Sequence, residues 1–239
     1  TERKQGERMK NEFSATASHE LRTPLTAIYG ALSLVNSGLV GELSPDAKEL
    51  IGISCRSAER LVRLVNDILD VEKIESCSMT YERVVQPVLP LLEQSIRATQ
   101  AYADQYQVRF ELICESGQDA QARVDADRVI QVVVNLLSNA AKFSPAGGAQ
   151  VTVRLQRLPG CVRVSVTDSG CGIPESFRSR IFDRFAQADA SDQRQKGGTG
   201  LGLNICKSII EAHEGHIDFV SEAGKGSEFY FDLPRVTPG

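Results

Sequence analysis

The 239-residue sequence contains no long hydrophobic run and no cysteine pattern typical of a metal site. No apolar stretch reaches the roughly 18 residues that a membrane-spanning helix needs, and no signal peptide is recognisable. The six cysteines form no CxxC pair, and the chain is too large to need disulfides as staples. We therefore expect a cytoplasmic chain without direct membrane contact, whose cysteines are reduced thiols in the core.

The sequence also lacks an excess of positive charge. Its formal net charge is −4, and no segment concentrates the Lys and Arg side chains that would neutralise a row of phosphates. Nucleic acid is therefore not an expected partner. The composition, 41% hydrophobic and 24% charged, suits one large or two smaller globular domains. The abrupt start, TERKQGERMK, predicts a piece of a longer protein and leaves room for an upstream anchor in the bacterial inner membrane.

Two helices are predicted between residues 7 and 78, because apolar residues recur there at steps of three and four. Between them, NSGLVGELSPD interrupts the pattern, with Ser44 as the expected N-cap and Pro45 at the first helical position. We predict an all-α helical hairpin over residues 1–78, whose apolar seams favour a dimeric four-helix bundle. The seams consist of Leu21, Leu25, Ile28, Leu32 and Val35 in the first helix, and of Ile51, Cys55, Ala58, Val62, Val65 and Leu69 in the second.

From residue 79 the rhythm changes to short β-like runs that alternate with helical patterns. The predicted strands are VRFELI, AQVTVRL, VRVSVTD, HIDFVS and EFYFDL, and the predicted helices lie near residues 87–103, 126–142 and 199–213. The strands cluster late and in near-hairpin order, which favours an α/β sandwich, with helices on one face of a mixed sheet, over a Rossmann layout. We place the boundary near residues 76–81 and the second domain at 79–239.

The octapeptide SHELRTPL, residues 18–25, places a histidine beside a glutamate on the first helix. His19 lies about 200° around the helix axis from Leu21 of the seam, so its imidazole should face solvent. Most exposed histidines on helices have no function, but the neighbouring carboxylate of Glu20 can hold one ring nitrogen protonated and leave the other as a nucleophile. Pro24 predicts a bend that makes the position of the histidine adjustable.

A second group of polar residues lies in VVNLLSNAAKFSP, residues 133–145. Asn135 and Asn139 are four residues apart and share one helix face, with Lys142 one turn further. Two carboxamide oxygens can hold Mg²⁺ while the ammonium group meets a phosphate. A helix cap or an ordinary polar face is the alternative explanation for two such asparagines.

Two glycine-rich stretches follow. In TDSGCGIP, Asp168 can accept a hydrogen bond from an exocyclic amino group, and Gly170 and Gly172 let the backbone approach a base. GGTGLGL, residues 197–203, opens a helix whose N–H groups and macrodipole favour phosphate. Taken alone, the first stretch is more often an ordinary turn, and the second is a weak signal.

SHELRTPL resembles the phosphoacceptor box of sensor histidine kinases of the HisKA type. In that family the histidine accepts the γ-phosphoryl group of ATP and passes it to an aspartate of a response regulator. The resemblance implies that His19 is phosphorylated and that Glu20 acts as the general base. It also implies that Thr23 positions water when such a kinase works as a phosphatase, although its hydroxyl can equally bond back into a kinked helix.

The order of motifs in the second region is similar to that of the HATPase_c catalytic ATP-binding domain of histidine kinases, from the ATPase superfamily shared with gyrase, Hsp90 and MutL. That order is the Asn box, the Asp-Gly-Gly box, IFDRF, the Gly-rich box and GKGSEFYF. The resemblance covers nearly the whole chain. It implies ATP and Mg²⁺ as cofactors and an ATP lid at residues 186–198, a polar segment without apolar anchors that we expect to be mobile.

Positions within these boxes imply individual roles. Asn135 and Asn139 would hold Mg²⁺ and phosphate, and Lys142 would contact phosphate. Phe143 would lie near the adenine, whose amino group Asp168 would recognise. The remaining residues implied to bind the nucleotide are Gly170, Gly172, Ile173, Gly198, Thr199, Gly200, Leu201 and Gly202.

Two further features come from the same resemblance. Arg184 in IFDRF can stabilise the transferring phosphoryl group, with a surface salt bridge as the alternative. EAHEGHI, residues 211–217, departs from the family pattern, because Glu214 stands where a glycine is common. We expect His213 and His216 in this stretch to be surface residues.

Together the motifs predict a protein-histidine kinase that phosphorylates His19 with Mg·ATP, works as a homodimer, and has a response regulator receiver domain as partner and possible phosphatase substrate. TERKQ resembles the tail of a PAS sensor domain, so residues 1–8 should end an upstream signalling linker of a PAS-linked or hybrid kinase. Two alternatives stay open. A simple ATPase is disfavoured, because Asn135 stands where a water-activating glutamate is expected. A catalytically silent module would regulate another kinase by dimerisation.

Overall fold

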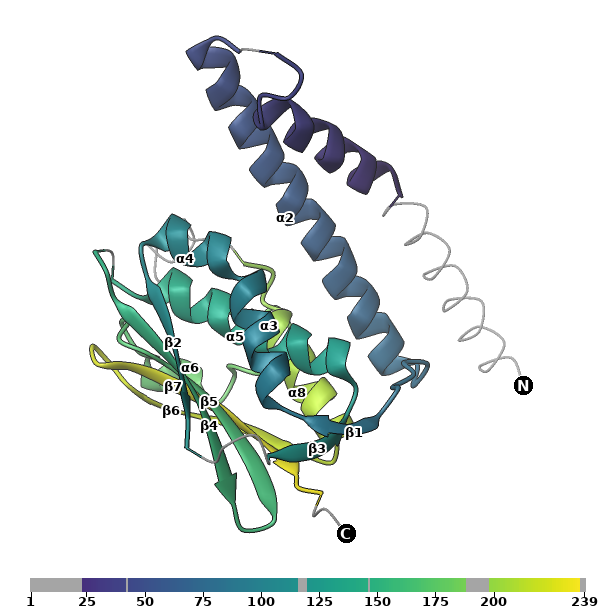
Figure 1. Cartoon of the computed structure of the whole chain (residues 1–239), viewed down its shortest axis with the longest axis vertical. Helices are drawn as coiled ribbons and strands as arrows, with labels where there is room; N and C mark the ends of the chain where they lie inside the picture. Colours follow the sequence, from purple (N-terminus) through teal and green to yellow (C-terminus); the bar gives the residue numbers. More distant parts are fainter. Residues whose placement is uncertain (1–22, 42, 116–119, 146, 188–197, 237–239) are drawn as a thin grey trace. The chain divides into compact units, whose positions relative to one another are not determined.

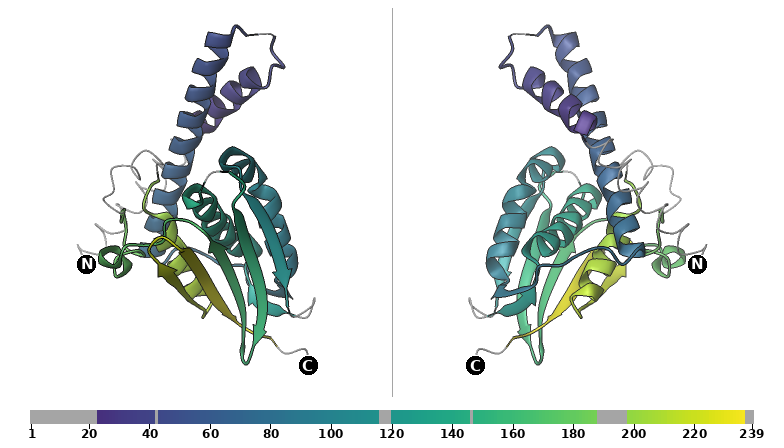
Figure 2. Two further views of the ribbon diagram at one scale, coloured as in Figure 1. Left: turned by 90° about the vertical axis from the view of Figure 1, so that its left-hand side faces the viewer. Right: turned by 90° about the vertical axis from the view of Figure 1, so that its right-hand side faces the viewer.

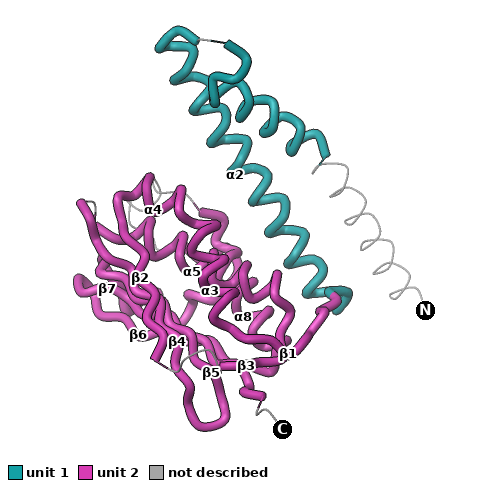
Figure 3. The backbone as a smooth tube through the Cα atoms, in the orientation of Figure 1, with its two compact units in different colours: residues 1–79 teal, residues 80–239 magenta. Residues whose placement is uncertain are grey.

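The computed structural model (Figure 1) describes residues 23–41, 43–115, 120–145, 147–187 and 198–236. The chain divides into two compact units, residues 1–79 and residues 80–239 (Figure 3). Within the described part of the chain, none of the helices has the length and hydrophobicity to span a bilayer.

The first unit is a helical hairpin, as the sequence predicts. Residues 23–36 are the described part of its first helix, and α2, Pro45–Glu75, is the second. The Oγ atom of Ser44 accepts a hydrogen bond from the Ala47 backbone N–H at 3.3 Å and so caps α2. Pro45 occupies the first helical position, where its missing N–H costs no hydrogen bond.

Two apolar stripes run along α2. The predicted seam contains Ala58 and Leu69, which are buried. A second stripe, also at steps typical of a helix face, consists of Leu50, Ile53, Leu61 and Ile68. Each of these residues has between 40% and 65% of its surface exposed. An exposed apolar stripe of this length is typical of an association surface.

The second unit is a two-layer α/β sandwich built on a five-stranded mixed sheet in the order β2-β4-β5-β7-β6. The β2 and β4 strands pair in parallel, and every other neighbouring pair is antiparallel. The strands are β2 (Arg109–Cys114), β4 (Gln150–Leu158), β5 (Cys161–Asp168), β6 (His216–Glu222) and β7 (Gly226–Pro234). They are the five strands that the sequence predicts, and the predicted fold class is confirmed.

Helices cover one face of this sheet (Figure 2). The buried side chains of Val162, Val164 and Val166 alternate along β5 and therefore point to the helical layer. The helices are α3 (Leu89–Ala98), α4 (Gln100–Tyr106), α5 (Ala126–Phe143) and α8 (Gly202–Ala212), and a short helix, α6 (Glu175–Arg178), follows β5. Because α5 packs on α3, α8 and β5, it is the centre of the helical layer.

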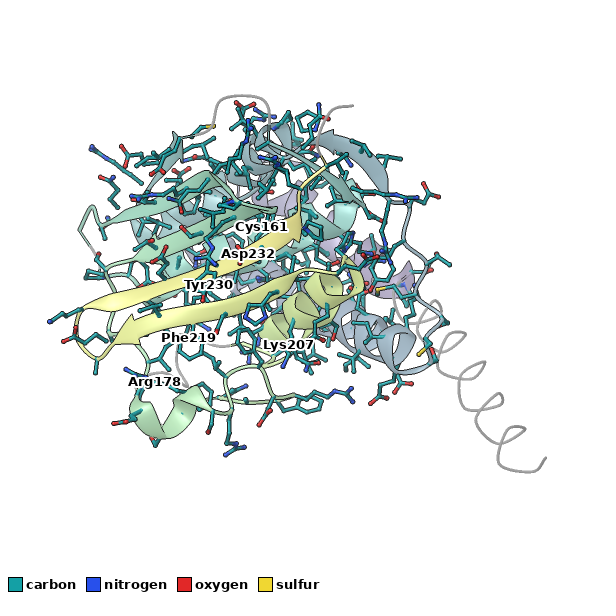
Figure 4. The ribbon with its side chains drawn as sticks, turned by 90° about the horizontal axis from the view of Figure 1, so that it is seen from below. Cys161, Arg178, Lys207, Phe219, Tyr230 and Asp232 are labelled. Atoms are coloured by element: carbon teal, nitrogen blue, oxygen red, sulfur yellow. The ribbon has the colours of Figure 1, made fainter. Side chains whose placement is uncertain are left out.

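The opposite face of the sheet is polar. On it Arg163 forms two hydrogen bonds of 2.7 Å with the Asp232 carboxylate, and its guanidinium lies 4.1 Å from the centre of the Tyr230 ring. Figure 4 shows Tyr230 and Asp232 on β7 near Cys161, at the start of β5. The bidentate pair and the stacked ring join β5 to β7 on the face opposite the helical layer.

The secondary structure differs from the prediction in two places. The single helix expected at residues 87–103 is divided at Thr99, whose hydroxyl donates to the Ser95 carbonyl at 2.7 Å and competes with the backbone pattern. Two strands were not predicted, β1 (Val84–Pro87) and β3 (Gln121–Val124), which form a separate antiparallel pair. Strands of four residues carry too little alternation to be recognised from sequence.

The environments of some side chains also differ from the prediction. Among the cysteines, Cys206 is buried as expected, whereas Cys77 and Cys171 are exposed in turns and are not core thiols. His216 is exposed as expected, but the expectation for His213 is wrong, since only 3% of its surface is accessible. Its ring is buried because it closes the C-terminus of α8 against the chain before α5.

Candidate functional site

The candidate site lies on α5 and on the two glycine-rich stretches that adjoin this helix. One face of α5 is buried in the core through Val129, Val132, Val133, Leu136, Leu137, Ala140 and Ala141. Asn135, Asn139 and Lys142 stand beside this apolar face and are half-buried. Their spacing of four and three residues puts them on one side of the helix, as predicted.

Asn135 lies against the first turn of α8. Its Nδ2 donates a hydrogen bond to the Cys206 Sγ at 3.5 Å. A Cβ atom at Gly202 would lie 2.5 Å from the same Nδ2, so a larger residue at this position would displace the Asn135 carboxamide. No side chain of the described residues caps the start of α8, and its first N–H groups form a site that favours an anion.

The last turn of α5 adjoins both glycine-rich stretches. The Lys142 Nζ lies 4.7 Å from the centre of the Phe143 ring, and a Cβ atom at Gly198 would lie 3.2 Å from this ammonium. On the other side, a Cβ atom at Gly170 would lie 2.5 Å from the Phe143 carbonyl oxygen. Lys142 therefore lies near the chain that leads into α8, and the backbone of Phe143 lies against the turn after β5.

Asp168 ends β5 and is half-buried. Its carboxylate accepts a hydrogen bond of 2.7 Å from the Gly170 backbone N–H and another from the backbone of Ser227. Burial raises the pKa of Asp168 above its ordinary value, and the two hydrogen bonds oppose this shift. Backbone donors thus hold the carboxylate in a fixed place, with acceptor capacity left for a ligand.

The turn after β5 packs closely against the β6–β7 hairpin and is hydrogen-bonded to it. Gly172 has a φ of 68°, and a Cβ atom there would overlap the Glu222 carbonyl oxygen. The Ile173 N–H donates to the Ser221 Oγ at 2.8 Å, and Arg178, labelled in Figure 4, donates to the Ser221 carbonyl at 2.6 Å. Sequence reasoning missed Ser221 and Arg178, because a lone serine and a lone arginine carry no motif.

The IFDRF segment adjoins α8. The Phe182 carbonyl accepts a hydrogen bond from the Asn204 side chain at 2.9 Å. Gly200 has a φ of 72°, and a Cβ atom there would lie 2.8 Å from the Phe185 Cα. This contact requires glycine and puts the segment beside the Gly-rich box, while Arg184 is exposed on it.

Several predicted features lie outside the described residues. These are His19, Glu20 and most of the predicted lid, residues 188–197. The bend expected at Pro24 depends on the carbonyl of residue 20, so it lies outside them as well. Thr23 is the first described residue and is exposed in the first unit.

The described site has two chemically different ends. At one end, Asn135, Lys142 and the N-terminus of α8 at Gly202 offer a carboxamide, a cation and backbone N–H groups, which suit an anionic group. At the other end, the Asp168 carboxylate suits a flat ring that donates a hydrogen bond, and the Phe143 ring, 4.7 Å from the Lys142 Nζ, lies where the two ends meet. This arrangement can hold an elongated ligand with an anionic tail and a polar aromatic head.

Two family models match the chain. The model described as "Histidine kinase-, DNA gyrase B-, and HSP90-like ATPase" matches residues 124–237, and the model described as "His Kinase A (phospho-acceptor) domain" matches residues 9–77. The first match contains all the site residues of the second unit, and the second contains His19, Glu20 and Thr23.

Curated relatives and a solved structure agree with these matches. The chain is 38% identical over 229 residues to the "Circadian input-output histidine kinase CikA" of Synechococcus elongatus and 36% identical over 231 residues to the "Signal transduction histidine-protein kinase BarA" of Escherichia coli K12. Each alignment covers 95% of this chain but only 30% and 25% of the respective relative. The crystal structure of full-length ShkA in complex with AMPPNP superposes with a TM-score of 0.74 at 30% identity, over 95% of this chain and 46% of that one.

Proposed function

The chain belongs to the histidine kinases, with a phospho-acceptor domain followed by an ATPase-type domain, and on this premise we propose that it transfers the γ-phosphoryl group of ATP to His19. The phosphoryl group then passes to an aspartate of a response regulator. We assign the phosphoacceptor role to residues 1–78 and the nucleotide role to residues 79–239. The observation that carries the proposal is the two-ended site at α5, where the anion-binding groups of Asn135, Lys142 and the N-terminus of α8 adjoin, at the last turn of the helix, the turn that holds the Asp168 carboxylate.

In the proposed complex the adenine lies at the ring-binding end, where the Asp168 carboxylate accepts a hydrogen bond from its amino group and Phe143 lies near its ring. Gly170, Gly172 and Ile173 form the turn that the adenine approaches. The triphosphate extends toward Lys142 and the N-terminus of α8. There the Gly-rich box adjoins the phosphates, with backbone N–H groups from Gly198, Thr199, Gly200 and Gly202. The Leu201 N–H donates instead to the Thr199 Oγ1 at 3.2 Å and so shapes this turn.

The donor set fits Mg²⁺. Asn135 and Asn139 offer neutral oxygen ligands, the hard donors that Mg²⁺ prefers, and within the described part of the chain the Asn139 side chain forms no hydrogen bond. Among the described residues no group of three His, Cys, Asp or Glu side chains could hold a metal ion. We therefore propose that Mg²⁺ enters with ATP, held by one or both asparagines and the phosphates. When bound, the ion neutralises charge that develops on the phosphates.

The transfer step follows from the resemblance and from charge balance. Glu20 accepts the proton from one imidazole nitrogen of His19, and the other nitrogen attacks the γ-phosphorus in line. A P–N bond forms while the bond to the β,γ-bridging oxygen breaks, and ADP leaves with that electron pair. Lys142 and the N-terminus of α8 stabilise the charge on the phosphates, and we assign a supporting role to the exposed Arg184.

The proposal includes two partners. The exposed apolar stripe of α2 is the surface through which two copies would form a four-helix bundle, so we propose a homodimer. The second partner is the receiver domain of a response regulator, with Thr23 positioning water if the chain also dephosphorylates that regulator. We propose that this reaction takes place in the cytoplasm. The chain spans only 30% and 25% of the length of CikA and BarA, whose other parts are where an input signal would act.

The test is a labelling experiment with γ-labelled ATP and Mg²⁺. The wild-type chain should acquire label that is stable in base and lost in acid, the behaviour of phosphohistidine, and His19→Gln should acquire none. Label in His19→Gln at the wild-type rate would refute the assignment. Nucleotide binding without label, together with formation of a heterodimer with another kinase, would instead support the silent regulatory module.

A further inference from the structure

The proposed function gives no role to the buried imidazole of His213. His213 is the C-cap of α8, and only 3% of its surface is accessible. Its Nδ1 lies 2.7 Å from the Ile209 carbonyl oxygen, and its Nε2 lies 3.0 Å from the Asp125 backbone nitrogen. A carbonyl oxygen only accepts and a backbone N–H only donates, so Nδ1 carries the proton and Nε2 does not. The geometry therefore requires a neutral imidazole in one tautomer.

Asp125 connects His213 to two other segments. It is the N-cap of α5, and its Oδ1 accepts a hydrogen bond from the Arg128 N–H at 3.2 Å. Its Oδ2 accepts a second hydrogen bond, from the Glu82 backbone N–H at 2.9 Å. One residue thus joins the end of α8, the start of α5 and the segment 81–83, which opens the second unit. We call Glu82, Asp125 and His213 the latch.

Side chains from the same segment surround the imidazole. The Tyr81 ring meets it edge-on, with the ring centres 5.3 Å apart, and the Arg83 guanidinium lies 5.8 Å from the centre of the Tyr81 ring. Arg83 also lies 3.3 Å from the Glu214 carboxylate, so the charged groups around His213 are Arg83, Asp125 and Glu214. Burial lowers the pKa of His213, and Arg83 adds to this, against the opposing effects of Asp125 and the hydrogen bond within α8.

The two helices that the latch joins meet again at the proposed phosphate end of the site. Along α5 and α8, the contact between Asn135 and Gly202 lies about 15 Å from the latch. At this contact a Cβ atom on Gly202 would displace the Asn135 carboxamide, which also donates to Cys206 of α8. The helices run antiparallel, and α8 is held against α5 at both of its own ends, at His213 and at Gly202. A displacement of α8 along α5 at the latch would therefore disturb the close contact at Asn135.

We propose that His213 is a positioning residue for the nucleotide. Through the latch it fixes the alignment of α8 on α5, and the segment 81–83 is coupled to this alignment. This inference rests on the proposed function, because it takes the contact of Asn135 with Gly202 as part of the ATP site. His213 touches no ligand and acts through the two helices. Protonation of Nε2 would place a second donor opposite the Asp125 N–H, and the hydrogen bond between them would be lost. Acid would therefore release the latch.

Three variants of the whole chain separate this role from general stabilisation. His213→Ala removes both hydrogen bonds of the ring, whereas His213→Gln keeps an acceptor near the position of Nε2 and does not titrate. His216→Gln is the matched control, because it makes the same change at an exposed histidine three residues further along the chain. Each variant is studied well below its unfolding temperature, with circular dichroism to show that it is folded.

The expected results concern affinity and its pH dependence. The dissociation constant for Mg·ATP, measured by calorimetry, should rise about tenfold in His213→Ala and change less than about twofold in His213→Gln and His216→Gln. The KM for ATP should rise in parallel, with little change in the labelling rate at saturation. Between about pH 7.5 and about pH 5.5, affinity should fall more steeply in the wild type and in His216→Gln than in His213→Gln.

Two results would overturn the proposal. One is a folded His213→Ala chain with the dissociation constant of the wild type and only a lower unfolding temperature, because His213 would then be merely structural. The other is unchanged hydrogen exchange in His213→Ala without nucleotide, because this would exclude transmission along the helices. The proposal predicts that amides near Asn135 exchange faster in His213→Ala than in the wild type, relative to the amides of β5. A wild-type chain that binds no ATP would refute the proposed function, and hydrogen exchange would still decide the latch.

Discussion

Asp168 shows how a single residue can combine a cost to folding with a use in binding. Its carboxylate is half-buried and its pKa is raised by burial, although two backbone N–H groups bond to it. A buried charge that is stabilised only by neutral donors is retained at a cost to stability. Such an environment is typical of sites where an ionised group has a ligand to bind.

We predict that Asp168→Asn separates stability from binding. The amide keeps an acceptor for the Gly170 N–H, so the unfolding temperature at neutral pH should stay the same or rise. The affinity for Mg·ATP should fall at least about tenfold, because a charge-assisted hydrogen bond to the adenine amino group is lost. Calorimetry and thermal unfolding of the same samples would check this, and an unchanged affinity would exclude Asp168 as the residue that recognises the adenine.

The pH dependence of stability gives a second check on Asp168. Its folded-state pKa is raised, so just above the ordinary carboxyl pKa the folded chain holds more protons than the unfolded chain. The contribution of Asp168 to stability therefore falls as pH rises through that window. Urea unfolding across this pH range should show the fall in the wild type and lack it in Asp168→Asn, and equal slopes in both chains would contradict the assignment.

Asn139 allows a test of the metal assignment. We predict that Mg²⁺ increases ATP affinity in the wild type and that Asn139→Ala loses most of this increase, with little effect on ATP affinity when a chelator removes the ion. Calorimetric titrations with and without Mg²⁺ would measure the difference. An equal increase in both chains would show that Asn139 is not a ligand.

The residues of the site could be predicted where chemistry and spacing coincide. The side chains of Asn135, Asn139 and Lys142 recur at helical steps, so their shared side of α5 follows from sequence. His213 could not be placed in this way, because the groups that bury it lie near residue 125 and residues 81–83, far away in the chain. Ser221 was missed for the same reason, since its hydrogen-bond partner Ile173 belongs to another segment.

At the scale of elements, the glycine-rich turn after β5 is fixed by close backbone packing. We predict that Gly172→Ala lowers the free energy of unfolding by about 3 kcal/mol or more, because a Cβ atom would both overlap the Glu222 carbonyl and stand at positive φ. The matched control is Gly224→Ala, which has a φ of 81° but no atom within 4 Å of the Cβ position. It should cost only about 1 kcal/mol.

Urea unfolding of the two variants would measure this difference. Equal losses would contradict the packing account, because the strain of positive φ is common to both positions. The affinity for ATP should also fall more in Gly172→Ala than in Gly224→Ala, since only Gly172 lies in the turn that the adenine would approach.

The long elements are the part of the fold that the sequence predicts best. The helix α5 and the five strands of the large sheet carry strong periodic patterns, and the N-cap of α2 has its expected serine. The small β1–β3 sheet and the division at Thr99 depend on tertiary context and on a local side-chain hydrogen bond. Periodicity contains neither kind of information.

At the scale of the whole molecule, we predict that the exposed stripe of α2 makes the chain a dimer. Leu50 and Leu61 expose 65% and 44% of their surface, and replacing both with Glu should yield a monomer in sedimentation velocity experiments. ATP affinity should be unchanged, because the nucleotide residues belong to the other unit. Leu39→Glu is the control, at a position 80% exposed in the turn between the helices, and it should remain a dimer. A double variant that stays dimeric would place the interface elsewhere.

The central claim is that a phosphoryl group moves from a nucleotide bound by the second unit to a histidine of the first unit. The most direct measurement is tandem mass spectrometry, under neutral conditions, of the chain after incubation with ATP and Mg²⁺. The account predicts a phosphoryl group on His19 in the wild type and a clearly lower initial rate of its appearance in Asp168→Asn at an ATP concentration near the dissociation constant of the wild type. A phosphoryl group on a different residue, or none despite measured ATP binding, would contradict it.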